Sequence, residues 1–130
     1  MLALETLHGL RVIASPAALD TAEWGESITA LRLAPDDVFA VGAALADATT
    51  IEAADAHAII VDESGFVGCW LTTSEFANVA AHIEWHLPTN RPAFAQGYVA
   101  GVPAKLWLTD DRALLLCAGP YAADLAERLQ

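Results

Sequence analysis

Two histidines four residues apart have the spacing in this sequence that is most typical of a metal site. His82 and His86 flank Glu84 in the segment HIEWH, and a helix that extended over both would project the two imidazoles from one side. Such a pair can begin a zinc or iron site. However, the HExxH order is absent, spacing fixes no third ligand, and Pro88 limits the helix. We therefore predict surface or helix-end histidines and no metal ligands, with a metal-dependent enzyme as the least favoured function.

The carboxylates and thiols form no catalytic set that the sequence alone identifies. The acidic pairs Asp62–Glu63 and Asp110–Asp111 fall in two segments predicted to be turns, where carboxylates commonly bond to their own backbone. A general acid or base needs burial and a charged partner to bring its pKa near neutrality. Cys69 and Cys117 lie at the ends of predicted strands without basic neighbours, which is typical of small buried hydrophobic residues. We predict no catalytic residue.

Aromatic residues outside the predicted strands are candidates for a surface that binds a partner. Trp85 precedes a loop bounded by prolines, and this loop carries Arg91 and Phe94. Trp24 lies at the end of a short predicted helix near the N-terminus. Tryptophan and arginine are enriched among the residues that dominate binding energy at interfaces. The interface candidates are therefore Trp24, Trp85, Arg91 and Phe94.

Composition and charge limit the classes of partner. The 130 residues fit one domain, and the hydrophobic share of 55% is above that of an average soluble chain. A net charge of -11, from 17 acidic and 6 basic side chains, would repel nucleic acid and anionic lipid. No apolar run is long enough to span a membrane, and the N-terminus lacks the features of a secretion signal. We expect a cytoplasmic protein that binds neither nucleic acid nor membranes.

The clearest structural pattern lies in the C-terminal third. The apolar runs 104–108 and 113–117 are separated by the polar segment 109–112, which predicts a β-hairpin. Tyr121, Leu125 and Leu129 then recur at helical spacing. The pattern is strand, strand, helix.

The middle of the chain resembles that pattern. Residues 57–61 and 66–71 predict two strands joined by a turn at 62–65. A helix follows, capped by Thr72, Thr73 or Ser74, and the segment LPTNRPAF after it predicts an exposed loop or connector. The unit thus appears twice in this prediction, and Leu31, Leu33, Asp36 and Val41 begin like a third copy.

The N-terminal half is less regular. Residues 27–34 and 38–41 predict strands around a Pro35-Asp36-Asp37 turn, although that turn could instead begin a helix. Residues 43–56 are expected to be partly helical. Residues 10–14 could form a short strand and 15–25 a short helix with Ser15 as cap and Pro16 in the first turn, but an arm that docks on another subunit would look the same.

Repeated strand-strand-helix units predict an α+β fold. Their helices should pack on one face of an antiparallel sheet, as in ferredoxin-like and related two-layer domains. The other interpretation is three unrelated hairpins. The predicted organisation is an N-terminal arm, or short strand and helix, over residues 1–26 and a single α+β domain over 27–130.

Several phrases resemble the gamma subunit of heterotetrameric sarcosine oxidase, within the glycine-cleavage T-protein (folate-binding) superfamily. They are Leu33–Gly42 (LAPDDVFAVG), Val61–Ser64 (VDES), Ala95–Trp107 (AQGYVAGVPAKLW) and Tyr121–Leu125 (YAADL). The likeness covers about Ile28 to Gln130 and consists of pieces of hairpins and helix starts. Thr72-Thr73 stands where the family tends to have Gly-Pro, and Ala118-Gly119 lacks a basic residue often found there, so the chain resembles a diverged relative.

The resemblance implies a non-catalytic subunit or accessory module of a flavin-dependent sarcosine or amine oxidase complex. It implies no cofactor in this chain, with flavin and folate in the larger subunits, and no folate-contacting residue can be carried over. The expected partners are those larger flavoprotein subunits, or a second copy of the chain. The alternative is a stand-alone protein that binds a folate-type small molecule.

Overall fold

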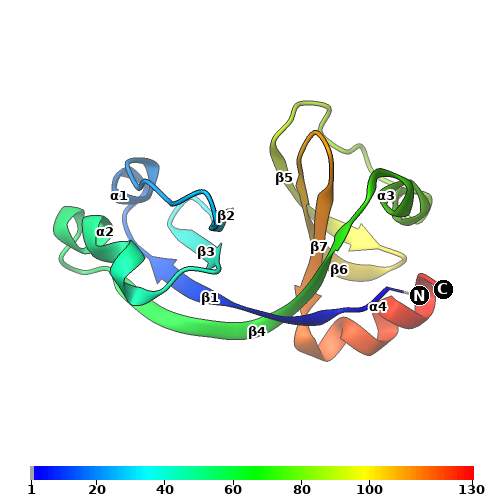
Figure 1. Ribbon diagram of the computed structural model, residues 1–130, viewed down its shortest axis with the longest axis horizontal. Coiled ribbons are helices and arrows are strands. Elements are labelled where there is room, and N and C mark those ends of the chain that lie inside the picture. The colour runs from blue at the N-terminus through cyan, green and yellow to red at the C-terminus, as the bar shows by residue number, and fades with distance from the viewer. Residues whose placement is uncertain (1) are drawn as a thin grey trace. The chain divides into compact units, whose positions relative to one another are not determined.

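The computed structural model describes residues 2–130, which divide into two compact units (Figure 1). Unit 2 is Leu7–Ser64, and unit 1 combines the N-terminal residues through Thr6 with Gly65–Gln130. Two strands pass from one unit to the other, β1 (Glu5–Ile13) and β4 (Ile59–Leu71).

Unit 2 contains an antiparallel sheet in the order β2-β3-β1-β4. Strands β2 (Thr29–Ala34) and β3 (Asp37–Val41) form the predicted hairpin around Pro35-Asp36. Strand β1 lies on the other side of β3, with pairs running from Gly9 and Val41 to Ile13 and Asp37. The N-terminal segment is thus a strand and a helix, and its strand is longer than predicted.

Three short helical segments cover one face of that sheet: α1 (Pro16–Asp20), the 3₁₀ helix η1 (Leu45–Ala48) and α2 (Thr49–Ala54). The predicted cap of α1 is confirmed, because the Ser15 hydroxyl accepts the Ala18 N–H at 3.2 Å. The helix ends at Asp20, short of Trp24. The buried core of unit 2 comprises Leu10, Val12, Ala14, Ala18, Leu19, Val38, Ala48 and Ile51.

Unit 1 contains an antiparallel sheet in the order β4-β7-β6-β5, with β5 (Ala93–Val99), β6 (Val102–Leu108) and β7 (Ala113–Ala118). The predicted β6–β7 hairpin is confirmed. Strand β5 was not predicted, and it joins β6 through a two-residue turn. Ala100 and Gly101 in that turn have φ values of 51° and 79°, the positive φ pair that a tight hairpin turn needs.

Helices α3 (Thr73–Ala80) and α4 (Ala122–Arg128) pack on one face of this sheet, and the 3₁₀ helix η2 (Gly119–Tyr121) precedes α4. Thr72 caps α3, since its hydroxyl accepts the Glu75 N–H while the Glu75 carboxylate accepts the Thr72 N–H. The buried core comprises Leu71, Val79, Val99, Val102, Ala104, Leu106, Leu108, Ala113, Leu115, Cys117 and Leu125. The α+β class with an antiparallel sheet is confirmed.

The hairpin predicted over residues 57–71 is wrong. Residues Asp62–Gly65 are not a turn; they continue β4, which is one strand of 13 residues (Figure 1). A local run of polar residues and glycine favours a turn, but here Glu63 forms an ion pair with Arg11 of β1 in the sheet. With this hairpin gone, the strand-strand-helix unit is seen at β6-β7-α4 but is not repeated in the middle of the chain.

Candidate functional site

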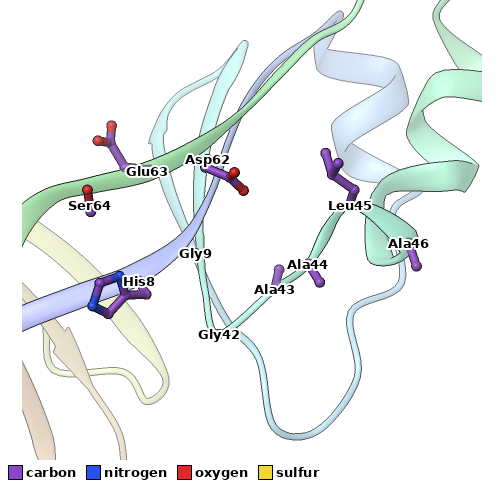
Figure 2. Close-up of a pocket in the computed structure, with 10 residues that line it drawn as sticks. All are labelled: His8, Gly9, Gly42, Ala43, Ala44, Leu45, Ala46, Asp62, Glu63 and Ser64. Carbon is purple, nitrogen blue, oxygen red and sulfur yellow. The ribbon is translucent and has the colours of Figure 1, made fainter.

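An open groove in unit 2 runs between β4 and the segment that leads into η1. Its volume is about 710 Å³, and it is lined by His8, Gly9, Gly42, Ala43, Ala44, Leu45, Ala46, Asp62, Glu63 and Ser64 (Figure 2). Strand β1 supplies His8 and Gly9, and β4 supplies the three polar residues at 62–64. The remaining wall consists of small glycine and alanine residues and the larger apolar side chain of Leu45.

Beside this groove, the unit 2 part of β4 has a sheet neighbour on one side only. Strand β1 pairs with it there, whereas β7 pairs with β4 from Phe66 onward. Residues Ile59–Ser64 are therefore an edge strand within the described part of unit 2. Two β-branched side chains on this edge are largely exposed, Ile59 at 57% and Val61 at 50%. An edge with exposed apolar side chains is the usual template for pairing with another strand.

Two neighbouring carboxylates on β4 have different environments. Glu63 accepts a hydrogen bond from Arg11 Nη1 at 3.0 Å, so its charge is compensated. The Asp62 side chain is exposed and has no hydrogen-bond or ion-pair partner among residues 2–130. Figure 2 shows Asp62 pointing into the space between β4 and the segment that carries Leu45, whereas Glu63 points to the other side of the strand. The groove therefore presents one uncompensated carboxylate.

Charge is distributed unevenly over the two units. The sequence Leu7–Ser64 carries ten acidic and two basic side chains, a formal charge of -8. Both of its arginines form ion pairs inside the unit, Arg11 with Asp37 and Glu63, and Arg32 with Asp20. Unit 1 has seven acidic and four basic side chains. A field of negative sign surrounds unit 2 and favours cationic partners.

The groups whose pKa values depart from normal are not tuned for proton transfer. Burial raises the pKa of the Cys69 thiol to about 11 and also raises that of Cys117, so both thiols stay protonated at neutral pH. The backbone N–H groups of Ser15 and His57 lower the pKa of Asp55, and the Thr72 N–H lowers that of Glu75. These carboxylates hold helix ends in place.

The predicted histidine pair lies beyond the helix. Helix α3 ends at Ala80, so His82 and His86 are in the irregular segment that follows, and both are exposed. Across residues 2–130, no group of three or more His, Cys, Asp and Glu side chains is placed to hold a metal ion. Within the same range, no helix is long and apolar enough to cross a membrane.

The four predicted interface residues belong to different units. Trp24 is half-buried against the core of unit 2. Trp85 is half-buried in unit 1, where its indole N–H donates to the Tyr98 carbonyl at 2.8 Å. Phe94 is half-buried on β5 opposite Trp107, and Arg91 is exposed, with its guanidinium bonded to the Pro88 and Asn90 carbonyls. Their role in binding a partner remains a prediction.

A second hollow, of about 780 Å³, lies at the start of α3 in unit 1. It is lined by Trp70, Leu71, Thr72, Thr73, Ser74, Ala77, Asp111 and Arg112. The Arg112 guanidinium lies 3.7 Å from the centre of the Trp70 ring, a cation–π contact. The exposed ring is thus already partly covered by a side chain of the same unit.

Sequence reasoning missed the residues of the unit 2 groove. The run His57–Val61 was interpreted as the first strand of a hairpin, and Asp62 as a turn residue. The sequence holds no signal for this edge: Ile60 packs against the core of unit 2 while Ile59 and Val61 are exposed, yet all three residues are apolar. Only the pairing with β1 shows that this stretch is an edge.

Comparison with known proteins identifies the fold. No protein-family model matches the sequence, and no curated protein matches it significantly. Among solved structures, a chain of the heterotetrameric sarcosine oxidase from Corynebacterium sp. U-96, in complex with pyrrole 2-carboxylate, matches with a TM-score of 0.73 and 15% identity. The match covers 97% of this chain and 79% of that chain. The resemblance seen in the sequence is therefore confirmed at the level of the fold.

Proposed function

We propose that this chain is a non-catalytic subunit of a flavin-dependent complex of the sarcosine oxidase type. The observation that carries the proposal is the match of almost the whole chain to one chain of a heterotetrameric sarcosine oxidase. The match extends over both compact units, so it concerns the entire fold and not one shared motif. In this proposal the flavin and the oxidation chemistry belong to larger partner subunits.

The chemistry of the described residues supports a role in assembly. Both thiols have raised pKa values, and the carboxylates with lowered pKa values bond to backbone N–H groups. The features left open to a partner are an unpaired strand edge, exposed apolar side chains and a strongly acidic unit. These features are suited to binding another protein.

Co-expression with candidate flavoprotein subunits tests the proposal. Affinity purification of this chain should recover a yellow complex with a fixed ratio of subunits, and that complex should oxidise N-methylated amino acids. The chain purified alone should be colourless and inactive toward the same substrates. Turnover by the isolated chain, or its purification without any flavoprotein when the native partners are present, would contradict the proposal.

A stand-alone protein that binds a folate-type molecule is the second candidate. The observation in its favour is the hollow beside Trp70, whose volume of about 780 Å³ is in the range of small-molecule sites. A ligand that binds the folded chain raises its melting temperature. Thermal unfolding with and without tetrahydrofolate separates the two functions, because only the second predicts a dose-dependent rise.

A further inference from the structure

We infer that the edge of β4 at Ile59–Ser64 binds an extended, basic strand of a partner protein. The inference rests on the proposed function, in which the chain is a subunit, and it names the surface and the chemistry of the contact. Four features of unit 2 support it: a strand edge with no neighbouring strand, two exposed apolar side chains, one uncompensated carboxylate beside a groove, and a net negative charge.

The backbone supplies the first part of the contact. Residues Ile59–Ser64 pair with β1 on one side and have no paired strand on the other within the described part of unit 2. At Ile59–Asp62 and Ser64, the N–H and C=O groups that point away from β1 are therefore available for a further strand. Addition of a strand to such an edge gives affinity through main-chain hydrogen bonds, while alternate side chains give specificity.

The side chains of β4 define the sequence pattern of the incoming strand. Ile59, Val61 and Glu63 share one face, whereas Asp62 and Ser64 share the other. Residues directly opposite each other on paired strands have their side chains on the same face. A complementary strand therefore places apolar residues beside Ile59 and Val61 and a basic residue beside Asp62. Glu63 is already bonded to Arg11 and adds less to this recognition.

The groove of about 710 Å³ lies on the β1 side of β4, and Asp62 stands between it and the open edge. Asp62 points into it, and its opposite wall is the apolar segment Ala43–Ala46, which includes the exposed Leu45 (Figure 2). Lysine and arginine have long, flexible side chains with the charged group at the end. A basic side chain from a strand on the open edge therefore reaches the Asp62 carboxylate first, and the apolar wall with Leu45 lies beyond that carboxylate.

The net charge of unit 2 favours a basic partner over a second copy of this chain. Unit 2 carries ten acidic and two basic side chains, and both basic ones are paired inside the unit. Two such edges brought together would place like charges side by side, because each contributes Asp62 and neither contributes a free cation at this edge. Like-charge juxtaposition disfavours an interface, whereas a basic strand relieves the negative field. The occupant is therefore a basic strand of another protein.

A pair of synthetic peptides tests the surface on the isolated full-length chain. One peptide alternates valine and lysine over about eight residues, the other alternates valine and glutamate, and both carry a fluorescent label for anisotropy. We expect the lysine peptide to bind and the glutamate peptide to show at least about ten-fold weaker affinity. Because the contact is electrostatic as well as main-chain, raising NaCl from about 50 to about 500 mM should weaken binding of the lysine peptide.

Substitutions on β4 test whether the peptide binds at this strand. Val61→Lys replaces an exposed apolar side chain with a positive charge and should weaken the affinity for the lysine peptide by at least about ten-fold. Asp62→Asn removes the uncompensated carboxylate. It should weaken the affinity for the lysine peptide by about three- to ten-fold and reduce the dependence of that affinity on salt. The matched control is Tyr98→Lys, a similar change at an exposed residue of β5 in unit 1, which should stay within two-fold of the parent chain. Asp62 is exposed, so its variant also serves if Val61→Lys does not fold.

The inference is overturned if the two peptides bind equally, if neither binds, or if both β4 variants retain the parent affinity. Co-expression with flavoprotein subunits distinguishes failure of the β4 docking surface from failure of the proposed function. Recovery of a flavoprotein by the parent chain and equally by Val61→Lys would refute docking at β4 and leave the proposed function standing. Binding of the lysine peptide without recovery of any flavoprotein would refute the proposed function and leave the basic-strand surface standing.

Discussion

Arg11 connects three strands of unit 2 through a single guanidinium group. Its Nε and Nη2 atoms donate to the two Asp37 oxygens at 2.6 and 2.7 Å, and Nη1 donates to Glu63 at 3.0 Å. The side chain is on β1, and its partners are on β3 and β4. The hydrogen bond to Asp37 is the main cause that raises the pKa of Arg11, so the guanidinium stays charged at any ordinary pH.

Replacement of Arg11 should destabilise the protein more than replacement of the other arginine in this unit. Arg11→Met removes the guanidinium that bonds two partly buried carboxylates, and we expect a loss of about 1–3 kcal/mol in the free energy of unfolding. Arg32→Met, the control, breaks a pair with the exposed Asp20 and should cost less than about 1 kcal/mol. Urea denaturation measures both, and equal losses would show that Arg11 contributes only a surface ion pair.

The Cys69 thiol should react slowly with alkylating reagents at neutral pH. Its pKa is raised to about 11 because burial disfavours the thiolate, and the Glu75 carboxylate adds to the effect. Since the thiolate is the nucleophile, the rate of iodoacetamide labelling should rise about ten-fold per pH unit between pH 7 and 10. Mass spectrometry of the Cys117→Ser variant follows Cys69 alone. A rate that levels off below about pH 9 would contradict a raised pKa.

At the residue scale, local signals were predictable and long-range ones were not. Ser15 was predicted as a helix cap, and Thr72 as one of three candidates with Thr73 and Ser74, because a cap depends on the next three residues. Glu63 was placed in a turn because its neighbours favour one, whereas its partner Arg11 is 52 residues away in sequence. The site residue Asp62 was misplaced for the same reason.

The backbones of β1 and β3 lie close together at Gly9. A Cβ atom at this position would overlap the Ala40 carbonyl oxygen and would lie 3.0 Å from the Val41 Cα. These are backbone atoms of the paired strand, so no side-chain rotation relieves the overlap. Gly9 lies in the middle of β1 because the backbone of β3 leaves no room for a side chain there.

Gly9→Ala should therefore separate β1 from β3 and destabilise unit 2. We expect a loss of at least about 2 kcal/mol, as for overpacking against an element that cannot move freely. Gly25→Ala is the matched control, because a Cβ there meets nothing within 4 Å. Denaturation followed by the fluorescence of Trp24, the tryptophan of unit 2, reports on this unit if the other tryptophans are replaced by phenylalanine. An unchanged midpoint for Gly9→Ala would show that the strands tolerate a shift.

At the element scale, the helices and hairpins with complete local signals were predicted. The β2–β3 and β6–β7 hairpins and helices α1, α3 and α4 all have caps, turns or helical spacing in their own sequence. Strand β5 was missed because Gln96 and Gly97 interrupt its apolar residues. What holds β5 in place is pairing with β6 and the Trp85 side chain over Gly97, and no local pattern encodes these contacts.

At the scale of the whole molecule, the excess of negative charge is concentrated in one of the two compact units. Unit 2 carries a formal charge of -8 in 58 residues, and unit 1 has seven acidic and four basic side chains in a longer sequence. Repulsion among like charges opposes the compact state, and dissolved salt screens it over about 10 Å at an ionic strength of 0.1 M. The basic partner strand inferred above would relieve the same repulsion.

Salt should therefore stabilise the isolated chain, and unit 2 more than unit 1. Between about 10 and 200 mM NaCl we expect the melting temperature to rise by about 2–5 °C, as for a gain of roughly 1 kcal/mol. Sodium chloride is preferred to sulfate, because sulfate also strengthens the burial of apolar surface. Hydrogen exchange locates the effect: amides of β3 in unit 2 should gain more protection than amides of β7 in unit 1. A melting temperature that falls with salt would show that the ion pairs of Arg11 and Arg32 outweigh the repulsion, and the acidic surface would then no longer argue for a basic partner.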